Sequence, residues 1–378
     1  MSDSENSETG IASNRIMAID ALRGFDMFWL IGGPDGGREL VLAAIAMFRD
    51  PLPEAVLYHA EHVKWVGFSA WDLVMPLFLF VVGAAMPFSF LRRRELGQSK
   101  TELYVKIVRR FLILFVLGMI VQGHLLDFDL STLHIFANTL QAIAVGYLVA
   151  GILLLNAGLA VQVAVGVLLL LGYWALMMFI PLAGRGAGVI EEHANAALAV
   201  DEFVLGRFRD GTTYTWVLSS MTFTATVMLG VFAGELLRSR LTPVMRTAAL
   251  TGLGLMCLAA GWAWSEALGF PIIKHVWTSS MTLWAAGWSY LLLGLFYLLI
   301  DVIGWRRWAF PFVVIGMNAI TIYVLNRFIP FRTIAENLVG GLAKHLGAAG
   351  PFTVWSVSVS LAWLLLYYLY RQRIFLRI

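Results

Sequence analysis

The 378-residue sequence has few charged residues and a single cysteine, Cys257. Charged side chains make up 13% of the chain, about half their usual share in a soluble domain, whereas hydrophobic residues make up 60%. One cysteine excludes a disulfide framework. The net charge is only +3 and no run of Lys or Arg resembles a nucleic-acid patch, so we expect no nucleic-acid partner. This composition indicates an integral membrane protein.

The sequence also lacks the motifs of several enzyme classes. It contains no HExxH, CxxC, GxSxG or P-loop string, and no group of His, Cys, Asp or Glu with the spacing of metal ligands. We therefore expect no bound metal. Hydrolase and ATPase functions have no support from motifs.

Ten windows of mainly apolar residues are long enough to span a bilayer as helices, which takes roughly 20 residues each. They lie near 16–33, 66–90, 105–123, 134–155, 159–180, 215–236, 246–266, 277–301, 309–328 and 352–370. We predict an all-α, polytopic membrane bundle of about ten helices. Residues 16–378 form its single domain.

The orientation is predicted from the two kinds of loop. Residues 1–15 are polar and lack the basic region and cleavage site of a signal peptide, so we expect them to stay in the cytoplasm. The short loops after the second, sixth and eighth windows are rich in Arg, as cytoplasmic loops are. Both termini are then predicted inside. Two long loops, 34–65 and 181–214, lie outside and are long enough to suggest a function.

Polar residues inside the spans are candidate binding residues. Asp20 and Arg23 are spaced i, i+3 and share a helix face, either as a structural pair or as an inner anchor for an anionic ligand. Gln141, Asn318 and Tyr323 interrupt apolar stretches. Such residues commonly join helices by hydrogen bonds, and they are also candidate cofactor contacts.

The outer end of the second window carries His62 and Asp72. On a continuous helix the ten-residue separation places them about 15 Å apart, so contact between them requires a bent or looped entry. Lys274, His275 and Trp277 lie at the outer end of the eighth window, where a Lys and an aromatic belt are common. An ordinary loop histidine and an interfacial lysine therefore remain open as explanations.

Three strings in register give a more specific indication. They are IDALRGFDMFWLIGG (19–33), HVKWVGFSAWDLVMPLFLFVVGAAMPFS (62–89) and the long string that begins KHVWTSSMTLW at residue 274. In order and spacing they resemble the heparan-α-glucosaminide N-acetyltransferase family, over nearly the whole chain. The first string is also similar to the signature of a broader group of membrane acyltransferases.

The resemblance implies the transfer of an acetyl group from cytoplasmic acetyl-CoA to the amine of a glucosamine-type sugar on the outer side. It places the catalytic histidine on His62 and a supporting carboxylate on Asp72, within the motif that includes Trp65. The family's K-x-x-W motif falls on Lys274 and Trp277, and we expect these, with His275 and Trp65, to contact the acceptor. Its G-M-N motif includes Asn318. From their positions within the bundle we expect Arg23, Asp20, Gln141, Asn318 and Tyr323 to contact the cofactor. The resemblance further implies a multi-pass protein of the bacterial inner membrane, with a homodimer as its possible assembly.

Three departures from the family pattern lie on the outer side and concern the acceptor. Ile273 stands where the family often has Asn, TTYTW replaces an Asp-Pro-Glu-Gly string, and IGGPDGG replaces an Asn late in the first span. Free glucosamine, an oligosaccharide and a muropeptide therefore all remain possible acceptors. O-acetylation of an envelope glycan and transport of amino sugars or muropeptides are the alternatives.

Overall fold

A computed structural model of the protein describes residues 16–182 and 184–376, and the predicted polar segment 1–15 lies outside them. The regular secondary structure of the described residues is helical apart from one short hairpin, which confirms the all-α prediction. Eight helices are longer than 17 residues: α4 (Val74–Glu95), α5 (Lys100–Val121), α6 (Thr139–Asn156), α7 (Leu159–Phe179), α9 (Ser220–Arg238), α10 (Pro243–Ala267), α11 (Ser279–Tyr297) and α15 (Ala349–Arg371).

The shorter elements lie between these helices and at the amino end. The short helices are α1 (Met17–Phe28), α2 (Gly36–Ala46), α3 (Glu54–Ala60), α8 (Ala196–Leu205), α12 (Phe310–Met317), α13 (Ala319–Phe328) and α14 (Phe331–Ala343). The single turns and strands are η2 (Trp71–Leu73), η3 (Leu125–Asp127), η4 (Gly206–Phe208), the π-helical η5 (Leu298–Val302), β1 (Ile190–Glu191) and β2 (Ala194–Asn195). Both long loops that we predict to lie outside are thus partly folded.

Seven of the described helices are long and apolar enough to cross a membrane, and α12 with α13 forms an eighth candidate that is bent by 73°. The first predicted span contains only the 12-residue α1, which is about 18 Å long and shorter than the hydrocarbon core. In α5, Lys106, Arg109 and Arg110 interrupt the apolar run. The count of ten spans and the inside position of both termini stay predictions.

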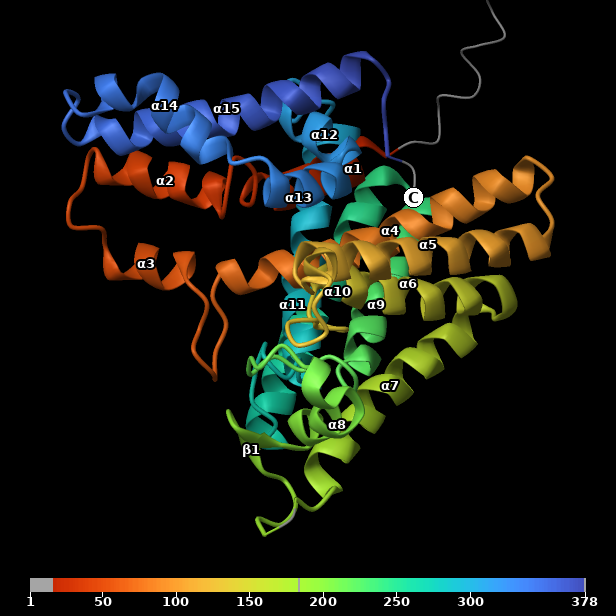
Figure 1. Ribbon diagram of the computed structural model, residues 1–378. Helices are drawn as coiled ribbons and strands as arrows, with labels where there is room; N and C mark the ends of the chain where they lie inside the picture. The colour runs from red at the N-terminus through yellow and green to blue at the C-terminus, as the bar shows by residue number, and fades with distance from the viewer. Residues whose placement is uncertain (1–15, 183, 377–378) are drawn as a thin grey trace, which may run out of the picture.

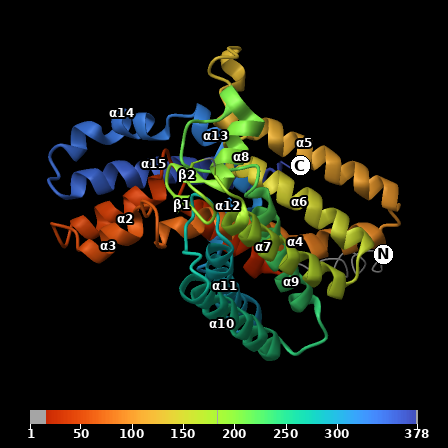
Figure 2. The ribbon, with the colours of Figure 1, turned by 90° about the horizontal axis from the view of Figure 1, so that it is seen from below.

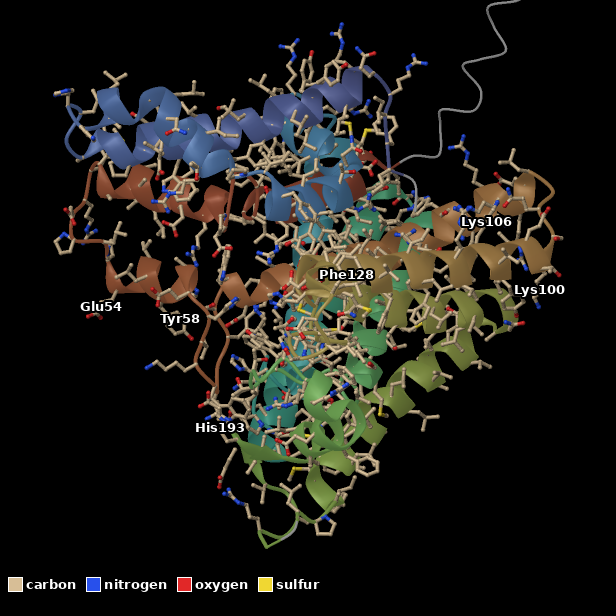
Figure 3. The ribbon with its side chains drawn as sticks, viewed as in Figure 1. Glu54, Tyr58, Lys100, Lys106, Phe128 and His193 are labelled. Atoms are coloured by element: carbon tan, nitrogen blue, oxygen red, sulfur yellow. The ribbon has the colours of Figure 1, made fainter. Side chains whose placement is uncertain are left out.

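The helices labelled in Figure 1 form three groups around a common centre, as Figure 2 shows. One group contains α2, α3, α14 and α15, a second contains α4 to α7, and α10 with α11 forms the third. Figure 3 places Lys100 and Lys106 at the opposite end of the molecule from Glu54 and Tyr58. That separation agrees with the predicted inner and outer positions of the two segments.

Close helix crossings hold the centre together. A Cβ atom on Gly83 of α4 would lie 2.0 Å from the carbonyl oxygen of Val227 on α9, and one on Gly24 of α1 would lie 1.7 Å from that of Phe312 on α12. Glycine allows these backbones to touch, as small residues do between membrane helices. The amino end of α4, which carries the candidate site, is therefore fixed by its packing against α9.

Candidate active site

Asp72 is fixed at the point where the outer segment enters α4. It lies in the single turn η2 with 1% of its surface exposed. Its Oδ2 atom accepts hydrogen bonds from the backbone N–H of Val63 at 3.3 Å, and from the backbone N–H and the hydroxyl of Ser69, both at 3.1 Å. A buried carboxylate with several donors is held in one orientation.

His62 reaches Asp72 because the intervening chain is a loop. Residues 61–70 leave α3 without regular structure and return to η2, so the 15 Å separation of a continuous helix does not apply. The Nδ1 atom of His62 lies 2.7 Å from Oδ1 of Asp72. The looped entry that the spacing required is present, and the His62 side chain is 44% exposed.

Lys274 joins the same cluster from a segment 212 residues further along the chain. Its Nζ atom lies 3.3 Å from Oδ1 of Asp72 and 3.1 Å from Nδ1 of His62. Burial lowers the pKa of Lys274 to about 8, although the Asp72 carboxylate acts in the opposite direction. The cation, the carboxylate and the imidazole form a compact cluster, which we call the triad.

The triad defines which nitrogen of His62 carries a proton. Oδ1 of Asp72 can only accept, so at 2.7 Å it requires a hydrogen on Nδ1. An ammonium group has no acceptor and therefore donates to Asp72 as well. In neutral His62 the lone pair is then on Nε2, at the other edge of a half-exposed ring.

The K-x-x-W spacing forms a turn that aims Lys274 at the triad. The backbone N–H of Trp277 donates to the carbonyl of Lys274 at 3.0 Å, and Trp277 has a positive φ of 49°. The Trp277 side chain is 2% exposed, and its Nε1–H donates to Thr226 on α9 at 3.2 Å. The structure places Trp277 in the core as the anchor of this turn.

His275 points to a second group of side chains beside the triad. Its ring stacks on Tyr214, with centroids 4.2 Å apart, and meets Trp65 edge-on at 5.6 Å. Its Nδ1 atom lies 2.6 Å from the hydroxyl oxygen of Thr213. Burial, with the Lys274 cation nearby, lowers the pKa of His275 to about 4. His275 is therefore neutral near pH 7. We call Trp65, His275 and Tyr214 the aromatic wall.

The predicted cofactor residues lie in other parts of the bundle. Asp20 and Arg23 form an ion pair of 3.3 Å on α1. Oε1 of Gln141 accepts from the backbone N–H of Ala137, and its Nε2–H donates to the carbonyl of Ile135, so both ends of this amide contact backbone.

Asn318 marks the break between α12 and α13. Its Nδ2–H donates to the carbonyl of Ile374 at 3.2 Å, while its buried Oδ1 atom has no hydrogen-bond partner among the described residues. The hydroxyl of Tyr323 on α13 accepts from Nδ2 of Asn138 at 3.2 Å. These contacts join helices. They do not bring Asn318 or Tyr323 into the triad.

Sequence reasoning missed three residues that build the site. Ser69 supplies two of the hydrogen bonds to Asp72, and its position three residues earlier was an available signal, since Ser commonly forms such turns. Tyr214 gives the aromatic wall its stacked face. Arg38 on α2 lies with its guanidinium carbon 4.8 Å from the ring of Trp71. No local pattern distinguishes Tyr214 or Arg38 from ordinary loop residues.

Fold and site together define a polytopic helical membrane protein with a His–Asp–Lys triad at the entry of a spanning helix. A family model described as a domain of unknown function, DUF5009, matches residues 15–187. Over nearly its full length the chain is similar to heparan-alpha-glucosaminide N-acetyltransferases. It is 25% identical to the enzyme of that name from Homo sapiens and 24% identical to the one from Mus musculus.

These alignments cover most of this chain but only part of each relative. The human alignment includes 96% of this chain and 60% of the relative, and the mouse alignment includes 97% and 61%. The chain thus spans about 60% of the length of the curated relatives it matches. The resemblance predicted from the three strings is confirmed.

Proposed function

We propose that this protein is a membrane N-acetyltransferase that moves an acetyl group from cytoplasmic acetyl-CoA to the amine of a glucosamine-type sugar on the outer side. The relatives carry the name of that activity. On the resemblance alone we also propose the bacterial inner membrane as its location and a homodimer as its assembly.

The observation that carries this proposal is the triad. His62 is held by a buried carboxylate at 2.7 Å, yet 44% of its side chain is exposed to an incoming substrate. An imidazole oriented through Nδ1 presents Nε2 as a base, which is the arrangement used in acyl transfer by many unrelated enzymes. The positioning of the base favours an enzyme over a passive binding module.

The chemistry requires a base of this kind. A glucosamine amine is largely protonated near neutral pH, and only the free base attacks a thioester. His62 would take the amine proton as the nitrogen–carbon bond forms and the carbon–sulfur bond breaks, leaving the thiolate of CoA to be protonated. Alternatively, Nε2 would first accept the acetyl group and then pass it to the amine. Both routes use His62 and Asp72 in the same places.

Support for a sugar acceptor comes from the aromatic wall. Trp65 and His275 meet edge-on beside the triad, and Tyr214 stacks on His275. Rigid aromatic rings of this kind provide an apolar surface with few degrees of freedom to lose. The C–H face of a pyranose ring can pack on such a surface, with its amine directed to His62. We assign acceptor contacts to Trp65, His275 and Lys274.

Support for CoA comes from basic side chains at the predicted inner end. A cavity beside the start of α1 is lined by Met17, Arg306, Arg307, Phe310, Val313 and Tyr370. Two guanidinium groups and an aromatic ring suit a phosphorylated nucleotide. Arg23 and Asp20 lie on α1 between this cavity and the outer end of the helix. We propose that the nucleotide of acetyl-CoA binds at this end, with Arg23 along its path.

The test is acetylation by the full chain in nanodiscs, supplied with labelled acetyl-CoA and glucosamine. Wild type is compared with His62→Ala and with His193→Ala, a matched change of an exposed histidine at the turn of the hairpin, which Figure 3 labels. We expect labelled N-acetylglucosamine from wild type and His193→Ala. His62→Ala loses roughly 10²-fold or more in rate, the usual contribution of a general base.

Two other results would redirect the assignment. Binding of acetyl-CoA without acetylation of any amine would favour O-acetylation, because a histidine base also serves a hydroxyl acceptor. Uptake of labelled sugar without acetyl-CoA binding would favour a transporter. The 73° break at Asn318 makes a transporter the second candidate function, since transporters bind substrates at interrupted helices.

A further inference from the structure

We propose that Arg38 is a positioning residue, which holds the loop of His62 against the turn of Asp72. This inference rests on the proposed acetyltransferase function, because Arg38 acts through His62. It gives a role to the part of the long loop 34–65 that precedes the motif beginning at His62.

The need for such a residue follows from how weakly α3 is packed. None of the seven residues of α3 is buried. The helix ends at Ala60, two residues before His62, and residues 61–70 have no regular structure. The apolar contacts of this loop come from Phe68 and Trp65, which lie after His62. The stretch from α3 to His62 therefore depends mainly on polar contacts.

Arg38 makes contacts with both ends of the His62 loop. Its Nη1–H donates to the carbonyl of Ala60 at 3.3 Å, where the loop begins. Its guanidinium carbon lies 4.8 Å from the ring of Trp71, next to Asp72 where the loop ends. The Trp71 ring in turn lies 6.0 Å from the ring of His62. One guanidinium thus joins the two segments that must stay close for His62 to meet Asp72.

The guanidinium is itself fixed from the side of α2. Nη2 of Arg38 lies 2.7 Å from Oε1 of Glu39 and 3.5 Å from Oδ2 of Asp35. Asp35 has a positive φ of 55° at the start of α2, a conformation that Asp tolerates better than most residues. Burial raises the pKa of Asp35, while Arg38 and then His62 oppose that rise. The side chain of Arg38 is 23% exposed, so solvent screens these pairs only in part.

Arginine suits this task and lysine does not. A guanidinium offers several donors in a rigid plane and stacks on aromatic faces, whereas an ammonium is a point charge. A lysine at position 38 can reach either Glu39 or the carbonyl of Ala60. It cannot hold both and lie over Trp71 as well.

The chain provides a matched control in Arg332 on α14. Its guanidinium carbon also lies 4.8 Å from a tryptophan ring, that of Trp355, and its Nε–H donates to Glu336 at 2.9 Å. Both arginines combine a carboxylate partner with a stacked ring. These contacts of Arg332 do not involve the His62 loop.

The experiment compares Arg38→Ala, Arg38→Lys and Arg332→Ala in the full chain in nanodiscs. The first readout is hydrogen exchange of peptides covering 59–71, which needs no activity. The second is kcat and KM for acetyl-CoA across pH. Far-UV circular dichroism and size-exclusion profiles identify any variant that fails to fold.

We expect faster exchange in 59–71 for Arg38→Ala and an unchanged rate for Arg332→Ala. We expect kcat to fall at least about tenfold in Arg38→Ala, since small misplacements of a reacting group are costly, with KM for acetyl-CoA within about twofold. The pH profile of kcat should change shape, and Arg38→Lys should be intermediate. A loss of kcat with an unaltered pH profile would indicate general destabilisation and overturn the proposal.

The two proposals fail in different ways. If wild type makes no product, the acetyltransferase assignment fails, and exchange of 59–71 still decides whether Arg38 holds the loop. If wild type is active and Arg38→Ala matches Arg332→Ala in kcat and exchange, the role of Arg38 is wrong while the acetyltransferase stands.

Discussion

Compared with Asp72 and Lys274, His62 is held loosely. Only 1% of the Asp72 side chain and 7% of the Lys274 side chain are exposed, whereas the value for His62 is 44%. Asp72 and Lys274 lie next to the packed helices α4 and α11, and His62 lies on a loop after the unburied α3. The two regions of the site therefore differ in the rigidity of their support.

This difference suits the roles that we propose for them. A residue that orients a base must keep its own position, and burial with several hydrogen bonds achieves this for Asp72. A base that exchanges protons with a substrate must remain accessible, and His62 does. Changes in the fixed region should therefore have the larger effects.

The largest effect is expected for Asp72→Asn. An amide cannot accept at both of its ends, so it cannot receive His62 and Lys274 on one side and Ser69 with Val63 on the other. The imidazole then loses its tautomer and orientation. We expect kcat to fall roughly 10²- to 10⁴-fold, the range seen for carboxylates that orient a catalytic histidine, when acetylation is measured at saturating acetyl-CoA.

The matched control is Asp129→Asn, in an exposed outer segment where the carboxylate accepts only from Ser131 nearby. Its kcat should stay within about twofold of wild type, as for most surface changes. Equal rates for Asp72→Asn and Asp129→Asn would remove Asp72 from the mechanism.

A moderate, pH-dependent effect is expected at Lys274. Because burial lowers its pKa to about 8, the ammonium loses its charge as pH rises through that value, and kcat of wild type should decline there. Lys274→Arg, which keeps its charge, should not show the decline. Lys274→Met should be slower at every pH and nearly flat above pH 8. Rates of acetylation between pH 6 and 10 provide the measurement.

The same lysine should make the free energy of unfolding rise with pH, whereas kcat falls. In the unfolded chain the pKa of lysine returns to 10.5, so between about pH 8 and 10.5 the unfolded state binds more protons than the folded state. Stability therefore rises with pH in this window. A wild-type melting temperature that falls from pH 8 to 10 by as much as that of Lys274→Met would contradict this assignment.

The sequence predicted the all-α fold class well, because the lengths of its apolar windows are enough to determine that class. It did not predict the break at Asn318, since the residues on both sides of the break are apolar and match one continuous window. It also placed the first span over 16–33, where the helix ends at Phe28. Residues 31–33 are apolar enough to extend the window, but Gly32 and Gly33 have positive φ values, which do not continue a helix.

For the site, motifs identified residues but not their contacts. The resemblance named His62, Asp72 and Lys274, yet spacing gave no reason to bring Lys274 to within 3.3 Å of Asp72. Arg38 had no signal, because an arginine in an outer loop is ordinary until its contacts with Ala60 and Trp71 are known. Long-range contacts depend on the packed fold, which local patterns do not determine.

The smallest effect is expected for His275→Asn, and it concerns acid stability. The folded protein lowers the pKa of His275 from 6.5 to about 4 because the ring is buried and lies near Lys274. The unfolded chain takes up this proton first as pH falls, so wild type loses stability between about pH 6.5 and 4. Asn has no proton to gain, and His275→Asn should lose less over the same range. Melting temperatures at pH 7 and 4.5, compared with those of the exposed-site variant His193→Asn, measure the difference, and equal losses in the two variants would show that His275 does not titrate in this way.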